Sequence, residues 1–349
     1  MKTLICEVNP ENIDIDVINE AGRIIREGGL VAFPTETVYG LGGDAFNPES
    51  SRKIYAAKGR PSDNPLIVHI AEMSAIDKLV TEIPDNARKL MDSFWPGPLT
   101  IILNKSEAVP TETTGGLGTV AIRMPSDEIA QSFIKAAGGY VAAPSANISG
   151  KPSPTNGHYV AQDMDGRIDM IVYGDDAVIG LESTIVDMTG DSPMILRPGF
   201  ITRSMLESVV GEVLVDQTIL EDASGVAPKA PGMKYRHYAP QGMLTIVDGE
   251  LEAVIAYIND AVERDIKDGY KTGVIATDQT CDRYHADLIF SAGDANTRSE
   301  VAHRLFTILR QFDDEKVERM YTESFADDEL GTAVMNRLLK AAGHRVVKV

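Results

Sequence analysis

VINEAGRIIREGGLVAFPTE (residues 17–36) contains, back to back, the two patterns that repeat along this chain. Its first part spaces apolar residues from Ile18 to Ile25 at helical intervals and stops at Gly28 and Gly29, which predicts an amphipathic helix with a glycine end. Its second part, LVAFPTE, has the apolar run of a β-strand. A helix followed at once by a strand is typical of an α/β fold.

The region 1–215 contains more predicted strands than helices. Asn47, a helix-capping residue, precedes Pro48, and together they predict a short helix that runs toward Lys58. Several predicted strands succeed one another with no helix between them, so we expect a mixed twisted sheet rather than a regular βαβ repeat. Further helices are expected over 85–94 and 127–137, and strands at PLIVHIA, LTIILN, TVAIRMP, YVAAPS, IDMIVY, STIVDM and MILRP.

Residues 216–242 differ in character from both neighbouring regions. The segment ASGVAPKAPGMKYRHYAPQG is rich in Gly, Pro, Ala and Ser and has no hydrophobic periodicity, which indicates a linker. Residues 243–349 return to a regular alternation of strands with helices, which predicts a small Rossmann-like domain on a parallel sheet. Its helices are expected over 250–268, 299–312 and 331–342.

Two details of this second domain bear on its structure and role. Thr297 and Glu300 have the spacing of a capping box at the start of a helix. No G-x-G-x-x-G motif follows the first strand, in LTIVDGELEA, so the phosphate-binding loop of a dinucleotide site is missing. The second domain is therefore not expected to bind NAD.

Composition and charge limit the classes of protein to which the chain can belong. With 43% hydrophobic and 24% charged residues over 349 positions, it should form globular domains. No apolar run approaches the roughly 20 residues that span a bilayer, and the first residues lack a signal-peptide core, so we expect a cytoplasmic protein without membrane attachment. The 33 basic and 52 acidic residues give a net charge of −19, which disfavours loose binding to RNA. The two cysteines, Cys6 and Cys281, cannot supply a disulfide framework or a CxxC metal site.

Five polar stretches stand at the ends of predicted strands in the first region. They concentrate hydroxyls, prolines and glycines where a chain need only turn, and sites are commonly assembled from such loops. The stretches are FPTETVYGLG (33–42), KGRPSDNPLIVH (58–69), VAIRMP (120–125), APSANISGKPSPT (143–155) and LESTIVD (181–187).

Lys58 and Arg60 flank Gly59 at a predicted helix end. Two cations beside a backbone that a ligand can approach closely suit a polyphosphate. A pair of solvated charges that favour the helix C-terminus would have the same sequence. The residues alone leave both interpretations open.

Arg123 and His69 are polar residues within apolar strands. A buried guanidinium needs a carboxylate or phosphate, so Arg123 should meet either an internal acid or the carboxylate of a substrate. His69 lies on the opposite side of its strand from Val68, and in isolation it is more typical of a structural histidine than of a ligand or base.

The loop 143–155 contains a run, ISGKPS, that resembles a P-loop only in part, because neither Ser nor Thr follows its lysine. Its Ser145, Asn147, Ser149 and Ser153 could hold phosphate or ribose oxygens, or could cap their own turn. The chain has no G-x-S-x-G or H-E-x-x-H motif and no clustered His and Asp, which argues against a serine hydrolase and a zinc hydrolase.

The five stretches, in this order, closely resemble the YrdC-like family in its long, two-domain form. Three later segments extend the resemblance: LRPG, APGMKYRHYAP and LGTAVMNRLLKAAG. The resemblance covers essentially the whole chain. It implies an enzyme that makes threonylcarbamoyl-adenylate and pyrophosphate from L-threonine, bicarbonate and ATP, for threonylcarbamoyladenosine in tRNA. It also implies Mg²⁺ carried by the triphosphate, and a downstream machinery that transfers the group to tRNA.

The resemblance further implies one cleft lined by two sets of residues, with Lys58 and Arg60 as the catalytic pair that neutralises phosphate charge. The residues implied for threonine are Thr37, His69, Arg123 and Ser183, with the backbone of Ala143. Those implied for ATP are Lys58, Arg60, Asn64, Thr119, Ser145, Asn147, Ser153, Arg197 and Tyr235.

The linker offers one more hypothesis, that residues 226–240 form a lid over this cleft. Tyr235 and Tyr238 stand with other polar side chains between prolines, a composition suited to specific contacts. The alternative is a tether that packs through its aromatic residues.

Two other functions compete with the synthase. Carbamoyl transfer from carbamoyl phosphate occurs in YrdC-like domains of hydrogenase maturation proteins, but those carry CxxC zinc modules. A non-catalytic RNA-binding module is the second alternative, and the acidic net charge disfavours it.

Overall fold

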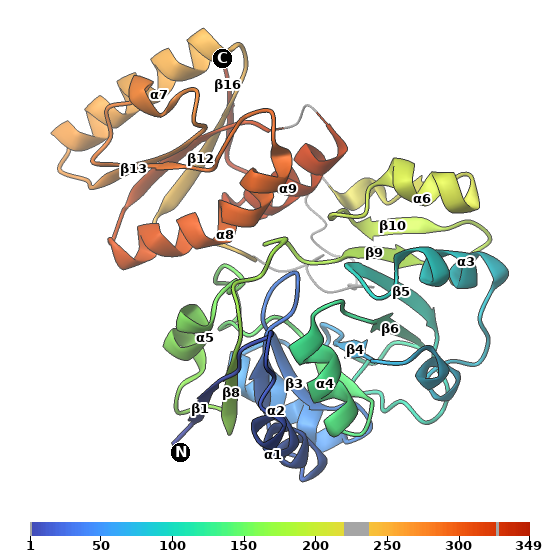
Figure 1. Cartoon of the computed structure of the whole chain (residues 1–349). Coiled ribbons are helices and arrows are strands. Elements are labelled where there is room, and N and C mark those ends of the chain that lie inside the picture. Colours follow the sequence, from blue (N-terminus) through green and yellow to red (C-terminus); the bar gives the residue numbers. More distant parts are fainter. Residues whose placement is uncertain (1, 220–236, 326–327) are drawn as a thin grey trace. The chain divides into compact units, whose positions relative to one another are not determined.

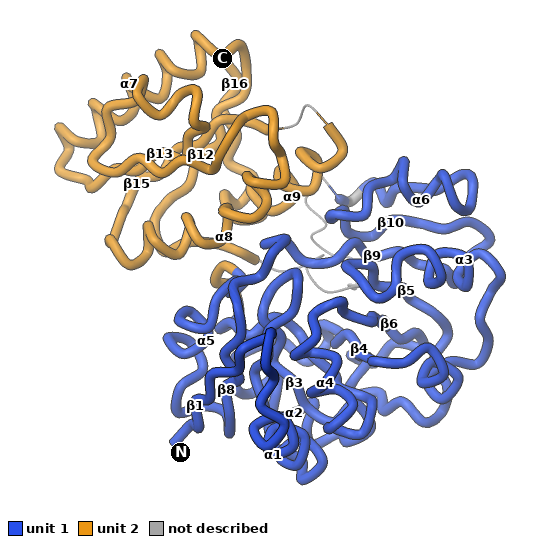
Figure 2. Tube along the Cα trace, in the orientation of Figure 1, with its two compact units in different colours: residues 1–149, 153–234 blue, residues 150–152, 235–349 orange. Residues whose placement is uncertain are grey.

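The computed structural model describes residues 2–219, 237–325 and 328–349 (Figure 1). The chain divides into two compact units (Figure 2). One consists of Met1–Ser149 and Ser153–Lys234, and the other of Gly150–Pro152 and Tyr235–Val349. Much of the predicted linker lies outside the described residues, so the boundaries at 215 and 242 and the lid over the cleft stay predictions.

Unit 1 is built on a mixed sheet with eleven strands in its described part. Their order is β1-β8-β2-β3-β7-β4-β6-β5-β9-β10-β11. Parallel pairs such as β4 with β6 stand beside antiparallel pairs such as β5 with β6, which confirms the predicted mixed sheet. The strands are β1 (Leu4–Glu7), β2 (Val31–Phe33), β3 (Gly40–Asp44), β4 (Ile67–His69), β5 (Leu99–Asn104), β6 (Thr119–Arg123), β7 (Val141–Ala143), β8 (Met170–Tyr173), β9 (Thr184–Asp187), β10 (Met194–Arg197) and β11 (Leu214–Val215).

The helices of unit 1 begin and end largely where the sequence signals predict. The Asn47 side chain accepts a hydrogen bond from the Glu49 N–H at 3.0 Å and so caps α2, which ends at Gly59 with a left-handed φ of 62°. Two helices, α5 and α6, were not predicted. The helices are α1 (Ile15–Arg26), α2 (Pro48–Lys58), α3 (Asp85–Phe94), α4 (Glu128–Ala136), α5 (Gly157–Met164) and α6 (Arg203–Val210), with short 3₁₀ turns η1 (Met73–Lys78) and η2 (Gln217–Ile219).

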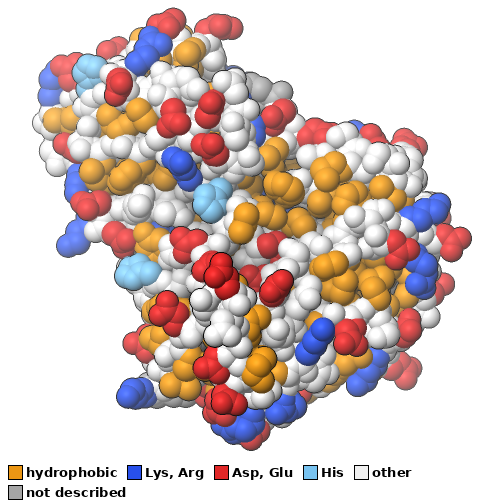
Figure 3. Space-filling model, viewed as in Figure 1, with side chains coloured by type: hydrophobic (Ala, Val, Ile, Leu, Met, Phe, Trp, Pro, Cys, Tyr) orange, Lys and Arg blue, Asp and Glu red, His pale blue; other side chains and the backbone are white. Residues whose placement is uncertain are grey.

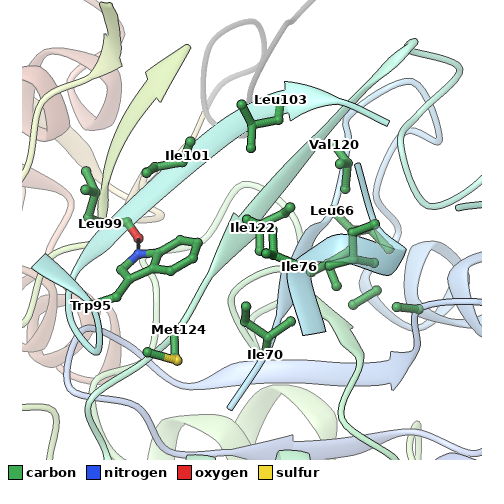
Figure 4. Packing of buried hydrophobic residues seen from close by; sticks show 14 of the residues in the cluster. Leu66, Ile70, Ile76, Trp95, Leu99, Ile101, Leu103, Val120, Ile122 and Met124 are labelled. Carbon is green, nitrogen blue, oxygen red and sulfur yellow. Dashed lines mark hydrogen bonds between the residues drawn. The ribbon is translucent and has the colours of Figure 1, made fainter. Parts of the chain in front are cut away.

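Side chains from the two faces of this sheet form separate apolar clusters. On one face, α1 and α4 pack against β2, β7 and β8. On the other, α2, α3, α5 and α6 contribute to a larger cluster with the alternate residues of the strands. Figure 4 shows part of it, where the buried Trp95 packs beside Ile101 and donates its indole N–H to the Leu99 carbonyl at 2.7 Å. The strands that carry the polar stretches are therefore anchored by packed apolar side chains.

Unit 2 confirms the predicted parallel sheet. Five strands in its described part pair in parallel, in the order β14-β13-β15-β12-β16. The strands are β12 (Met243–Asp248), β13 (Thr272–Ala276), β14 (Leu288–Ser291), β15 (Arg319–Glu323) and β16 (Val346–Lys348), and the helices are α7 (Leu251–Lys267), α8 (Arg298–Asp314) and α9 (Glu329–Ala341), with a 3₁₀ turn η3 (Cys281–Arg283).

The prediction of a capping box at the start of α8 is wrong. Thr297 takes φ −115° and ψ 76°, outside the extended conformation usual for a capping residue, and its side chain makes no capping hydrogen bond. The Glu300 carboxylate instead accepts a hydrogen bond from the Asp294 N–H at 3.2 Å. The glutamate thus stabilises the preceding loop rather than the helix end.

Candidate functional site

A row of directly paired residues crosses the centre of the unit 1 sheet. Val141 on β7 pairs with His69 on β4, His69 with Arg123 on β6, and Arg123 with Thr100 on β5. Paired residues on neighbouring strands point to the same face and stand about 5 Å apart. The register therefore brings the predicted His69 and Arg123 together, although they come from separate polar stretches.

Arg123 is only 4% exposed and meets an internal acid. Its Nη2 lies 2.7 Å from the Glu36 carboxylate, and its Nη1 donates to the Thr37 hydroxyl at 2.8 Å. The ion pair lacks aligned hydrogen bonds, because Nε and Nη2 of Arg123 and both carboxylate oxygens of Glu36 have no hydrogen-bond partner. The internal acid expected as one alternative is thus present, yet Arg123 keeps donors suited to a second carboxylate.

His69 is neutral in this setting. Burial lowers the pKa of His69 to about 3, and the positive charge of Arg123 adds to the shift. Its Nδ1 lies 3.0 Å from the Ile67 carbonyl oxygen, and its ring meets the edge of Phe33. A neutral imidazole can donate and accept one hydrogen bond without adding a second positive charge beside Arg123.

Ser183, directly before β9, contacts both a hydroxyl and a guanidinium. Its Oγ lies 2.7 Å from the Thr100 hydroxyl, while Arg197 donates to the Ser183 carbonyl at 3.0 Å and to its Oγ at 3.2 Å. Ser183 was predicted to bind threonine and Arg197 to bind ATP, so a residue of the threonine set contacts a residue of the ATP set here. Thr100 was not predicted, although a hydroxyl within the apolar strand LTIILN was a signal of a polar neighbour.

Lys58 is buried, at 1% exposure, which excludes the solvated pair as an interpretation. Its ammonium donates to the Ser145 carbonyl, to the Asn147 carbonyl at 2.5 Å and to the Asn147 side-chain oxygen at 3.4 Å. Ser145 in turn donates its hydroxyl to the same side-chain oxygen at 2.5 Å. Three predicted ATP residues, one at the end of α2 and two from the loop 143–155, therefore form one cluster.

Arg60 holds the turn that follows α2. Its Nε donates to the Asn64 carbonyl at 3.3 Å and its Nη2 to the Pro65 carbonyl at 3.1 Å. The side-chain oxygen of Asn64 is buried without a hydrogen-bond partner. A side chain on Gly59 would meet no atom within 4 Å, so the backbone between the two cations is open to approach.

The other predicted residues are less closely grouped. Ser153 donates its hydroxyl to Glu182 at 2.6 Å, which links loop 143–155 to the LEST stretch. Ala143 ends β7 opposite Ile67, on the same face as the row. Thr119 begins β6, at the opposite end of that strand from Arg123. Tyr235 lies outside the described residues.

The described residues contain no group of three or more His, Cys, Asp or Glu side chains placed to hold a metal ion. On the face in Figure 3, acidic and basic side chains are interspersed. No helix in the described part is long and apolar enough to cross a membrane.

Two family models match the chain in succession. The model of the Sua5, YciO and YrdC proteins, described as "Telomere recombination", matches residues 23–199. A model described as "Threonylcarbamoyl-AMP synthase, C-terminal domain" matches residues 201–343. The boundary between the two matches falls near the end of β10.

Relatives match over both units. The threonylcarbamoyl-AMP synthase of Pyrococcus abyssi is 47% identical over 99% of this chain and 100% of its own length, and that of Bacillus subtilis is 47% identical over 95% and 94%. The crystal structure of P. abyssi Sua5 complexed with L-threonine superposes with a TM-score of 0.94, at 46% identity over 99% of this chain and 100% of that one. The chain therefore belongs to the YrdC-like family, in the two-domain form represented by Sua5.

Proposed function

We infer that this chain is a nucleotidyltransferase that makes threonylcarbamoyl-AMP from L-threonine and ATP. The observation that carries this inference is the 47% identity to a threonylcarbamoyl-AMP synthase over 99% of this chain and 100% of the relative. The site supports it on chemical grounds, because unit 1 carries buried groups suited to an amino acid and buried groups suited to a polyphosphate.

The groups suited to an amino acid surround Arg123. Its Nε and Nη2 have no hydrogen-bond partner and can donate to a carboxylate in the planar fork that arginine presents. The hydroxyls of Thr37 and Ser183 are buried and polar, as recognition of a β-hydroxyl requires. Threonine offers both a carboxylate and a hydroxyl.

The groups suited to ATP are Lys58, Arg60 and Arg197. Transfer at the α-phosphate needs positioned reactants and neutralised charge more than covalent catalysis, and buried cations supply both. We propose that Mg²⁺ enters with ATP, held by phosphate oxygens, and adds to this neutralisation.

The proposed reaction also uses bicarbonate. The amine of threonine bonds to the bicarbonate-derived carbon with loss of water and gives a carbamate. An oxygen of the carbamate then attacks the α-phosphate, and pyrophosphate leaves. The product would serve a separate machinery that transfers the threonylcarbamoyl group to tRNA, in the cytoplasm.

Pyrophosphate release provides the test. With ATP and Mg²⁺, release should require both threonine and bicarbonate, and the nucleotide product should carry threonine. Release that ignores threonine, or turnover only with carbamoyl phosphate, would contradict the proposal. Salt-sensitive RNA binding without any turnover would favour the RNA-binding module instead.

A further inference from the structure

Glu36 is a buried acid that was not among the predicted site residues. It follows β2 in the stretch 33–42, and its side chain is only 9% exposed. Its backbone carbonyl is fixed by the Ile179 N–H at 2.8 Å. Its Oε2 lies 2.7 Å from Nη2 of Arg123, but neither carboxylate oxygen has a hydrogen-bond partner.

This arrangement is costly for the protein alone. A buried carboxylate that lacks hydrogen-bond donors loses the hydration it had in water, and an ion pair without aligned hydrogen bonds offsets that loss only in part. The one aligned bond that Arg123 makes in this cluster goes to Thr37. A ligand that brings N–H donors and a positive charge would satisfy Glu36.

We propose that Glu36 binds the protonated amino group of the amino-acid substrate while Arg123 binds its carboxylate. The proposal rests on the proposed function, because it assigns the partner of a second group of threonine. The amino and carboxylate groups of an α-amino acid are separated by a single carbon atom. Glu36 and Arg123 present the opposite charges side by side, at 2.7 Å, which matches that spacing in sign and scale.

Asp127, another acid close to this pair, is already engaged. Its carboxylate caps α4 by accepting the Ala130 N–H at 2.7 Å. Burial raises the pKa of Asp127, and the negative charge of Glu36 adds to the effect. Asp127 therefore serves the helix, and Glu36 is the acid with free acceptor capacity.

The experiment measures binding by titration calorimetry in the absence of ATP. The probes are L-threonine and the threonine analogue in which a hydroxyl replaces the amino group. Wild-type protein should bind threonine roughly 10- to 100-fold more tightly than the analogue, the scale of one charged hydrogen bond. Glu36→Gln should lose most of this preference, because the substitution should weaken the binding of threonine and leave the binding of the analogue unchanged. Asp169→Asn is the matched control, since the Asp169 side chain holds the Leu30 N–H, and it should keep the preference.

The outcomes separate this inference from the proposed function. Failure of wild-type protein to bind threonine at all would count against the function itself. If wild-type protein binds both probes equally, the role of Glu36 is overturned without any variant. The proposal can therefore be tested even if the Glu36→Gln protein does not fold. A folded Glu36→Gln protein with an unchanged preference would overturn it as well.

Discussion

Two buried cations in unit 1 show how differently a protein can use the same charge. Lys58 and Arg123 are 1% and 4% exposed. Lys58 directs its ammonium at carbonyl and amide oxygens of a single loop, whereas Arg123 lies against the carboxylate of Glu36 with two nitrogens that have no hydrogen-bond partner.

The difference teaches that burial alone does not identify the ligand of a cation. The Ser145 and Asn147 oxygens that accept from Lys58 are uncharged, so these hydrogen bonds hold the ammonium in place without themselves opposing its attraction to a phosphate. Arg123 has its charge opposed by Glu36, but its Nε and Nη2 make no hydrogen bond, so it gains most from a ligand with well-placed acceptors. Lys58 should therefore act through charge, and Arg123 through geometry.

The largest effect is expected from removing the charge of Lys58 or Arg60. Lys58→Ala and Arg60→Ala should each lower ATP turnover by roughly 100-fold or more, the scale seen when one charge-stabilising group is lost. Pyrophosphate release at saturating substrates measures it. Arg52→Ala on the same helix is the control, because that side chain is 54% exposed, and it should be near normal. Near-normal turnover in both test variants would make Lys58 and Arg60 structural.

Replacing Arg123 by lysine tests whether Arg123 binds its ligand through the planar geometry of its guanidinium. Lysine keeps the charge but loses the planar fork, so Arg123→Lys should raise the KM for threonine roughly 10- to 100-fold, the worth of a charge-assisted hydrogen bond, and change the KM for ATP little. Steady-state kinetics with each substrate varied in turn would measure the two effects. An equal rise in both KM values would mean that Arg123 supports the fold rather than the amino-acid site.

A smaller effect should distinguish threonine from serine. Both have the carboxylate, amine and hydroxyl that Arg123, Glu36 and Thr37 are proposed to contact, so only the methyl group differs. A methyl in a fitted pocket is worth about 1 to 3 kcal/mol, and kcat/KM for serine should be lower by about tenfold or somewhat more. Competition between the two amino acids in one reaction measures this ratio directly. Equal kcat/KM values for serine and threonine would mean that the pocket recognises only the polar groups of the substrate and not the methyl group.

The sequence predicted most strands of both sheets because their signals are local, but β1, β3 and β11 of unit 1 were not predicted. Asn47 and Gly59 bound α2 as expected, and the apolar runs became strands. The unpredicted helices α5 and α6 have eight residues each, too short for a clear helical period. The capping box at Thr297 failed because backbone angles, which the residue types do not specify, decide whether a side chain reaches the helix end.

Contacts within the site were harder to predict, because strand order sets them. Arg123 on β6 bonds Thr37, which follows β2, across 86 positions of sequence, and the order of strands in the folded sheet sets this contact. A polar residue in an apolar strand showed that Arg123 needed a partner, yet nothing in the sequence singled out Glu36. Thr100 carried the same kind of signal within LTIILN and was overlooked.

The smallest expected effect concerns stability against pH, and it tests whether the Arg123 side of the site excludes a second positive charge. The pKa of His69 is about 3 in the folded protein, against roughly 6.5 for an unfolded chain. Between these values the unfolded chain binds a proton that the folded protein does not. The contribution of His69 to stability is therefore complete above about pH 6.5 and is lost as the pH falls toward 3.

His69→Gln should remove this dependence, so that its free energy of unfolding falls less steeply with acid than that of wild-type protein, by up to about 1.4 kcal/mol per pH unit. Urea unfolding at pH 7, 6 and 5 measures the slope, and fluorescence of Trp95, the only tryptophan, reports on unit 1. His158→Gln is the control, because His158 is exposed and should keep the wild-type slope. If the free energy of unfolding of His69→Gln falls with acid as steeply as that of wild-type protein, His69 must accept a proton beside Arg123 in the folded state. The Arg123 side of the site would then tolerate a second positive charge.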